Sequence, residues 1–152
     1  MTTRSKTAAL LFMLFAFGAV MTEVGCSDAD SVSAVNVTLR EFSVTPDRSE
    51  VPNGTVNFHV TNAGTVNHEF LVIRTDLSAA ALPTAADGSY AENGTGTSLL
   101  EEVEEIAPGQ SRDVSIDLTD GNYVLICNMV HVVNGVPDSH YARGMRASFR
   151  VD

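Results

Sequence analysis

The stretch Gly121-Asn-Tyr-Val-Leu-Ile-Cys127-Asn-Met129 is followed, after ten further residues, by His140-Tyr-Ala-Arg-Gly-Met145, and this region carries most of the structural information in the chain. Asp120-Gly121 predicts a turn, and the apolar run after it predicts a buried strand that ends at the cysteine. Arg146 to Val151 follows the methionine, and its alternating apolar residues predict the strand that closes the domain. A cysteine, a histidine and a methionine therefore lie in the segment that connects two predicted strands.

Other short segments show the period-two alternation of half-buried strands, and turn signals separate them. Their apolar residues are Val35, Val37 and Leu39; Phe42 and Val44; Val56, Phe58 and Val60; and Val114, Ile116 and Leu118. The change of phase before Phe42 predicts a bulge at Arg40-Glu41. The nearly continuous apolar run from His68 to Arg74 predicts a strand covered on both faces. About seven short strands without a long helix predict an all-β fold, an antiparallel β-sandwich.

Residues 75–100 have a different composition, dominated by Ala, Thr, Ser, Gly and Asp. They predict a long loop, with a short helical turn near Ala79 to Leu82. Leu99 to Ile106 is compatible with one helical turn or with an edge strand. His59 alternates with Phe58 and Val60, so we expect it to point to solvent.

The N-terminal residues have the layout of an export signal. Arg4 and Lys6 precede an apolar run from Ala8 to Val20, which is short for a bilayer span of about 20 residues. Gly25-Cys26 follows this run. Residues 1–25 are therefore predicted to be a signal peptide of the lipoprotein type.

In this interpretation Cys26 is lipidated and anchors the exported chain to the membrane, on the periplasmic or extracytoplasmic side. A non-lipid cleavage nearby and an uncleaved N-terminal anchor are the alternatives, and each of them also exports the domain. The polar residues 26–33 predict a tether, and residues 34–152 predict one domain.

Charge limits the classes of partner. Residues 26–152 carry 7 basic and 18 acidic side chains, a net charge of −11. Such a surface excludes nucleic acid as a partner and is not drawn to anionic lipid. We therefore expect a monomer whose partners are proteins. A Cys26–Cys127 disulfide is an alternative for an exported chain, but it would tie a polar tail to the end of an apolar strand.

Side chains that can bind a metal ion occur in both halves of the chain. His68, in Asn62-Ala-Gly-Thr-Val-Asn-His68-Glu-Phe, joins Cys127, His140 and Met145 to give two imidazoles, one thiolate and one thioether. This is the ligand set of a blue-copper centre, in which His₂Cys binds in a plane and a weak Met lies on the axis. Soft sulfur ligands favour Cu(I) and imidazole also suits Cu(II), so such a site can hold either state. Without a metal, a buried Cys or Met is simply a core residue.

Four segments together resemble one known family. They are Gly121 to Asn128, His140 to Met145, Ala147 to Val151 and the segment Asn62-x-Gly-x-x-x-His68. These segments resemble the cupredoxins, and are most similar to the sulfocyanin-type small blue-copper proteins. The resemblance covers roughly residues 35–151 and implies a Greek-key β-sandwich with one type 1 copper ion. It implies that this ion is bound by His68, Cys127 and His140, with Met145 as axial ligand.

The chain departs from the family pattern in one place. Twelve residues separate Cys127 from His140, whereas the family has two to four between its cysteine and second histidine. His131 stands at the commoner spacing and is the alternative metal ligand. We favour His140, because the His-Tyr-x-x-Gly-Met context belongs to it. Residues 132–138 would then form an inserted turn beside the metal, since Asn134-Gly135 and Pro137 favour a turn.

The predicted function is that of an exported one-electron carrier between redox partner proteins, and not an enzyme. The solvent-facing edge of His140 is expected to exchange electrons, with Val132, Val133 and Val136 as an apolar docking patch. The alternatives are a copper-binding or storage module, and a copper-free cupredoxin-like interaction scaffold. A copper oxidase would need a second site built from additional histidines, and the chain has four histidines in all.

Overall fold

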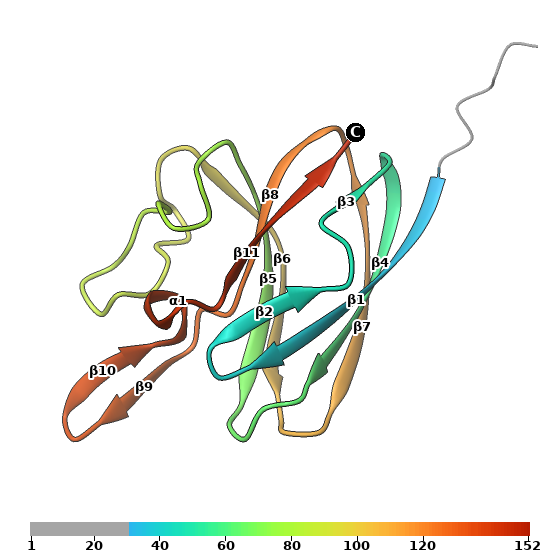
Figure 1. The fold of residues 1–152 in the computed structure, drawn as a ribbon. Helices are drawn as coiled ribbons and strands as arrows, with labels where there is room; N and C mark the ends of the chain where they lie inside the picture. Colours follow the sequence, from blue (N-terminus) through green and yellow to red (C-terminus); the bar gives the residue numbers. More distant parts are fainter. Residues whose placement is uncertain (1–30) are drawn as a thin grey trace, which may run out of the picture.

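Eleven strands and one short helix form the part of the chain that the computed structural model describes, residues 31–152 (Figure 1). The predicted signal peptide, residues 1–25, and the predicted lipidation site Cys26 lie outside the described residues. No helix within residues 31–152 is long and apolar enough to cross a membrane. In chain order the elements are β1 (Ser31–Arg40), β2 (Ser43–Pro46), β3 (Glu50–Val51), β4 (Gly54–Asn62), β5 (His68–Thr75), β6 (Thr97–Ile106), β7 (Ser111–Leu118), β8 (Gly121–Ile126), β9 (Val130–Val133), β10 (Val136–Ser139), α1 (His140–Arg143) and β11 (Arg146–Val151).

Two sheets pack face to face and confirm the predicted β-sandwich. The first has the strand order β2-β1-β4-β7, and the second has the order β3-β11-β8-β5-β6. Both sheets are mixed, which corrects the antiparallel prediction: β1 runs parallel to β4, and β3 runs parallel to β11. Alternation within a strand reports which face is buried but not which neighbour the strand pairs with, so the sequence could not reveal these parallel pairs.

The core between the sheets follows the predicted alternation. Val35, Val37 and Leu39 of β1 are buried, and Val56, Phe58 and Val60 of β4 lie opposite the second sheet. Phe58 joins the two layers, because its ring centroid is 5.4 Å from that of Phe70 and 5.6 Å from that of Phe149. Tilted aromatic pairs at these distances add to the hydrophobic stabilisation of the sandwich.

Three predicted boundaries differ in the structure. A tight turn at Glu41-Phe42 reverses the chain between β1 and β2, where the change of phase predicted a bulge. β1 begins at Ser31, three residues before the predicted start of the domain, because residues 31–33 pair with β4. Residues 97–106 form the edge strand β6, so the alternative of a helical turn is wrong.

The loop between β5 and β6 covers the outer face of the second sheet. Leu82 and Tyr90 of this loop are buried against Leu71 and Ile73 of β5 and against Ile126 of β8. Apolar residues on both faces of β5 are therefore covered, as its continuous apolar run predicted. In Figure 1 the loop forms the yellow-green excursion beside this sheet.

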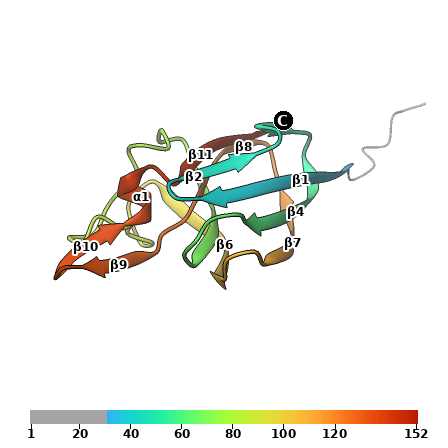
Figure 2. The same ribbon diagram turned by 60° about the horizontal axis from the view of Figure 1, so that its bottom comes forward.

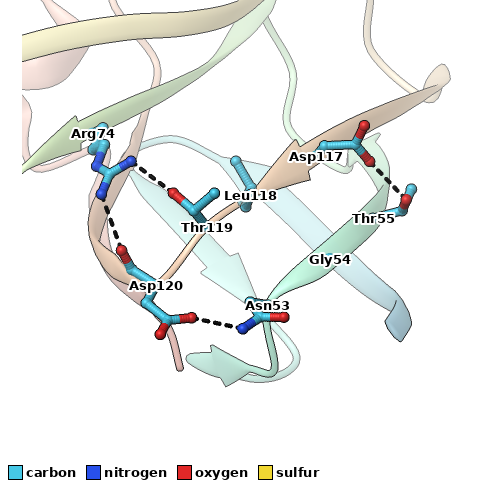
Figure 3. A pocket seen from close by; sticks show the side chains of 8 residues that line it. All are labelled: Asn53, Gly54, Thr55, Arg74, Asp117, Leu118, Thr119 and Asp120. Atoms are coloured by element: carbon cyan, nitrogen blue, oxygen red, sulfur yellow. Dashed lines mark hydrogen bonds between the residues drawn. The ribbon is translucent and has the colours of Figure 1, made fainter. Parts of the chain in front are cut away.

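Polar contacts close one end of the sandwich (Figure 3). The Arg74 guanidinium donates to Thr119 Oγ1 at 2.7 Å and to the Asp120 carbonyl oxygen at 3.0 Å. Asn53 Nδ2 donates to Asp120 Oδ1 at 2.9 Å, which joins the turn before β4 to the turn before β8. The polar groups of this surface pocket thus satisfy one another. Because β5 and β8 are antiparallel, this end lies opposite the start of β5 and the end of β8.

We expect Leu82→Ala to lower the free energy of unfolding by about 2–4 kcal/mol, since it removes a side chain that is 4 % exposed. Leu77→Ala in the same loop is the matched control, because Leu77 is 39 % exposed and its loss should cost less than about 0.5 kcal/mol. Urea unfolding of both variants provides the measurement. Equal, small effects would show that the loop does not contribute to the core.

Candidate metal centre

Cys127 directly follows the central strand of the second sheet. β8 pairs with β5 through Leu71 and Ile126, and with β11 through Arg146 and Ile126. The Cys127 backbone N–H donates to the Met145 carbonyl oxygen at 3.1 Å, which extends the pairing with the chain before β11. Cys127 is fully buried, and within residues 31–152 its thiol is free; the alternative partner Cys26 lies outside the described residues. The sheet therefore fixes the position of the sulfur atom.

Asn62 fixes the loop that leads into the first histidine. Its Nδ2 donates to the carbonyl oxygens of Val66 at 2.8 Å and Ile106 at 2.7 Å, and its Oδ1 accepts from the Gly64 N–H at 2.9 Å. The side chain is fully buried, so these three bonds satisfy polar groups that water cannot reach. His68 then begins β5 with no exposed surface.

His140 and Met145 are placed by a single helical turn. Ser139 caps α1 by accepting from the Ala142 N–H, and Gly144 ends the turn with φ of 116°. This left-handed conformation favours glycine and lets the Met145 N–H donate to the His140 carbonyl oxygen at 3.0 Å. Both side chains are buried, with exposures of 1 % and 0 %.

The residues between Cys127 and His140 form a hairpin, and the turn predicted within residues 132–138 lies at its tip. β9 and β10 pair antiparallel from Val130–Ser139 to Val133–Val136 around the Asn134-Gly135 turn. At its base the His140 N–H donates to the Met129 carbonyl oxygen at 2.9 Å. The twelve-residue connection therefore returns the chain to a point beside Cys127, and the hairpin projects from the sandwich (Figures 1 and 2).

Three metal-binding atoms converge between these elements. The Nδ1 atoms of His68 and His140 are 3.2 Å apart, and Cys127 Sγ lies 3.7 Å and 3.3 Å from them, respectively. Together with buried Met145 these residues form a site like that of type 1 copper. They are the four residues predicted as ligands.

The spacing of the donor atoms fits a small first-row metal ion. Bonds of roughly 2.0 Å to nitrogen and 2.3 Å to sulfur place three in-plane ligands about 3.5 Å apart. The separations of 3.2 to 3.7 Å agree with this value. Two imidazoles, one thiol and one thioether also match the preferences of copper in its two oxidation states.

Burial sets the protonation of the site. It lowers the pKa of His140 to about 4, with further contributions from nearby His68 and His131, and it lowers the pKa of His68. Both imidazoles are therefore neutral near pH 7 and can use a lone pair on Nδ1. Burial also raises the pKa of the Cys127 thiol to about 12, although the Glu69 N–H donates to Sγ at 3.4 Å. A bound metal cation reverses this preference and stabilises the thiolate.

His131 lies beside the convergent atoms but is not one of them. Its ring centroid is 4.8 Å from that of His140, on the strand β9. The expectation that the edge of His140 faces solvent is wrong, because this imidazole is 1 % exposed. Phe42 contacts the same ring edge-on at 5.3 Å between centroids.

Two polar residues near the site, Glu41 and Asn128, contact segments that are distant from them in the sequence. Glu41 Oε1 lies 3.2 Å from His68 Nε2, and no local motif marks this residue. Asn128 accepts from the Tyr90 N–H at 2.6 Å and donates to the Tyr90 carbonyl oxygen at 3.0 Å, so it binds the β5–β6 loop. His59 is a surface residue as predicted, and its Nδ1 lies 2.6 Å from Asp113 Oδ1.

Solved structures with the same fold include copper proteins. Reduced auracyanin from the photosynthetic bacterium Roseiflexus castenholzii has a TM-score of 0.53 and 19 % identity over 82 % of this chain and 99 % of its own. Auracyanin B has a TM-score of 0.51 and 20 % identity over 83 % and 92 %. Rusticyanin, described as a copper protein, has a TM-score of 0.51 and 16 % identity over 82 % and 80 %. At these low identities, the TM-scores show that the chain and these proteins share a fold.

No curated protein matches the chain. The family model of the cupredoxin-like domain, however, matches residues 7–136, which include His68, Cys127 and His131 and end before His140. The sandwich, the convergent ligands and this match agree. The chain belongs to the cupredoxin-like domain family.

Proposed function

We propose that this protein is an exported type 1 copper protein that carries single electrons between redox partner proteins. The observation that supports it best is the convergence of His68 Nδ1, His140 Nδ1 and Cys127 Sγ in a buried site beside Met145. A bound copper ion would supply a centre that alternates between Cu(I) and Cu(II). The chain's residues supply the coordination, the dry surroundings and the contact surface.

The backbone around the site favours electron exchange without large rearrangement. Each ligand either lies in regular structure or is hydrogen-bonded to it: His68 begins β5, Cys127 bonds to Met145, and Met145 bonds to His140. Tyr141 further fixes α1, because its hydroxyl accepts from the Leu82 N–H at 3.1 Å and donates to the Ala79 carbonyl oxygen at 2.9 Å. Ligands held this firmly can serve both oxidation states in one geometry.

The β9–β10 hairpin offers a docking surface next to the site. Val132, Val133 and Val136 are 72 %, 51 % and 63 % exposed, an unusual exposure for three neighbouring valines. His131 on the same hairpin lies against His140. A redox partner that covers the three valines would therefore approach the buried imidazole through His131.

The N-terminal residues support a location outside the cytoplasm, on the membrane. Cys26 precedes β1 by only a few residues, so a lipid on this cysteine would hold the sandwich near the bilayer. The proposed protein is a monomer anchored by its lipid on the periplasmic or extracytoplasmic side.

A carrier is favoured over the other candidate functions by the form of the site. A storage module would present open sulfur ligands, whereas Met145 is fully buried and Met129 packs against the core. A copper-free scaffold would have no use for three convergent donor atoms in its core. An oxidase would use additional histidines, and His59 is instead paired with Asp113 on the surface.

We expect the purified full chain to gain an intense visible absorption band from its thiolate–copper bond when Cu(II) is added, and ascorbate should bleach it. His140→Ala should abolish the band, because it removes one in-plane ligand. His131→Ala is the matched control and should retain it.

These outcomes separate the candidate functions. Stoichiometric copper binding without such a band would indicate a storage module. The absence of copper binding would indicate a copper-free interaction scaffold. A band that disappears in His131→Ala and persists in His140→Ala would move the second ligand to His131.

We expect Val132→Asp to slow electron self-exchange between the oxidised and reduced protein by about tenfold or more, because like charges facing each other across an interface are costly. NMR line broadening in mixtures of the two states measures this rate. Val32→Asp is the control: Val32 is 70 % exposed but lies on β1, away from the hairpin. The assignment of the docking surface is wrong if both variants exchange electrons equally fast while their absorption spectra are unchanged.

We expect Cys26→Ser to abolish the incorporation of radioactive palmitate into the full chain in a bacterial host, because it removes the site of lipidation. Cys127→Ser should leave the labelling unchanged. Metabolic labelling followed by immunoprecipitation makes the comparison. Absence of label from the wild type would favour a non-lipid cleavage or an uncleaved N-terminal anchor.

A further inference from the structure

Glu41 lies far from the ligands in sequence but in contact with one of them in space. It occupies the turn between β1 and β2, and its carboxylate reaches the loop before β5. Oε1 accepts from the Thr65 N–H at 2.7 Å and the Val66 N–H at 2.9 Å, and it is 3.2 Å from His68 Nε2. One oxygen atom therefore binds the backbone of the loop and the imidazole that ends it.

The contact determines which nitrogen of His68 carries the proton. An ionised carboxylate can only accept hydrogen bonds, so His68 Nε2 must be the protonated, donating atom. In a neutral imidazole the other nitrogen, Nδ1, is then an unprotonated lone pair. This is the atom that faces Cys127 Sγ and His140 Nδ1.

Three hydrogen-bond donors surround Glu41 Oε1: the N–H groups of Thr65 and Val66, and His68 Nε2. Hydrogen bonds to the charged form of a carboxyl group favour that form, so Glu41 is a carboxylate in this setting. The Glu41 side chain is 24 % exposed, whereas the His68 side chain is fully buried. The Glu41 carboxylate thus contacts one nitrogen of the His68 ring, and the other nitrogen of that ring is one of the convergent donor atoms.

Gly64 leaves the space that the carboxylate occupies. A Cβ atom at this position would overlap the Glu41 carboxylate oxygens, and the three atoms nearest to it all belong to that group. The Asn62-x-Gly segment therefore does two things: Asn62 holds the loop, and Gly64 admits the carboxylate.

We propose that Glu41 is a positioning residue for the copper site, which holds His68 in the Nε2–H tautomer and lowers the reduction potential through its charge. A carboxylate that accepts a hydrogen bond from a ligating histidine orients the imidazole ring and raises its basicity. A negative charge near the site favours Cu(II) over Cu(I), since Cu(II) carries the larger positive charge. The effect on potential rests on the proposed electron-carrier function, whereas the effect on the tautomer does not.

Two substitutions separate geometry from charge. Glu41→Ala removes both, and we expect copper affinity to fall about 10- to 100-fold. Glu41→Gln keeps an amide oxygen that can accept from His68 Nε2 and the loop N–H groups, so affinity should fall less while the reduction potential rises. Glu50→Gln removes the same charge from β3, at the opposite end of the sandwich, and should change neither quantity.

Three measurements on the full chain test this proposal. Nitrogen-15 NMR of the metal-free protein reports the His68 tautomer, competition with a chelator reports copper affinity, and voltammetry reports the potential. We expect Nε2–H in the wild type and in Glu41→Gln, and a mixture of tautomers in Glu41→Ala. Wild-type tautomer and affinity in Glu41→Ala would overturn the inference.

A further variant covers the case in which Glu41→Ala does not fold. Gly64→Ala displaces the carboxylate without deleting it, so it should also weaken copper binding and mix the tautomers. Unchanged values in Gly64→Ala and an unchanged potential in Glu41→Gln would likewise overturn it. If the wild type binds copper but forms no ascorbate-reducible site, the electron-carrier function fails, and the tautomer measurement still decides the role of Glu41.

Discussion

The pairing of β8 with β5 on one side and β11 on the other is the constraint on which the site depends. Ile126, the last residue of β8, is paired with both neighbouring strands, so the cysteine that follows it lies between the start of β5 and the start of β11. His68 is the first residue of β5, and Met145 directly precedes β11. A shift in register by one residue would turn the sulfur atom to the other face of the sheet. The hydrogen bonds of three strands therefore hold the ligands together.

Burial determines the protonation states of the side chains in this site. The four ligand side chains have almost no exposed surface, so neutral imidazoles and a protonated thiol are the stable forms in the absence of metal. Two imidazole nitrogens and a sulfur atom that meet at one point in a low-dielectric core are stabilised further when a cation binds their lone pairs. Because the backbone fixes the donors in advance, little of the binding energy of a metal is lost in reorganising them.

Two segments outside the main sheets surround the site. The β9–β10 hairpin occupies the Cys–His connection and places His131 over His140, so the second histidine is shielded from solvent. The β5–β6 loop covers the outer face of the second sheet and receives the Tyr141 hydroxyl, so the helical turn between the hairpin and Met145 is anchored. The hairpin covers the second histidine, and the loop stabilises the turn that carries His140 and Met145.

Local pattern was sufficient to predict the β-sandwich and its buried residues, because alternation is a property of short segments. The resemblance to the cupredoxins, together with ligand chemistry, predicted the four residues that meet in the site. The turn at Asn134-Gly135 was also predicted, whereas the pairing of β9 with β10 on either side of it was not. Only the tertiary structure decided that β1 pairs in parallel with β4, that the hairpin buries His140, and that Glu41 meets His68 across 27 positions of sequence. These features arise from packing between segments distant in the chain, and no residue pattern within a single segment encodes which distant segment it will contact.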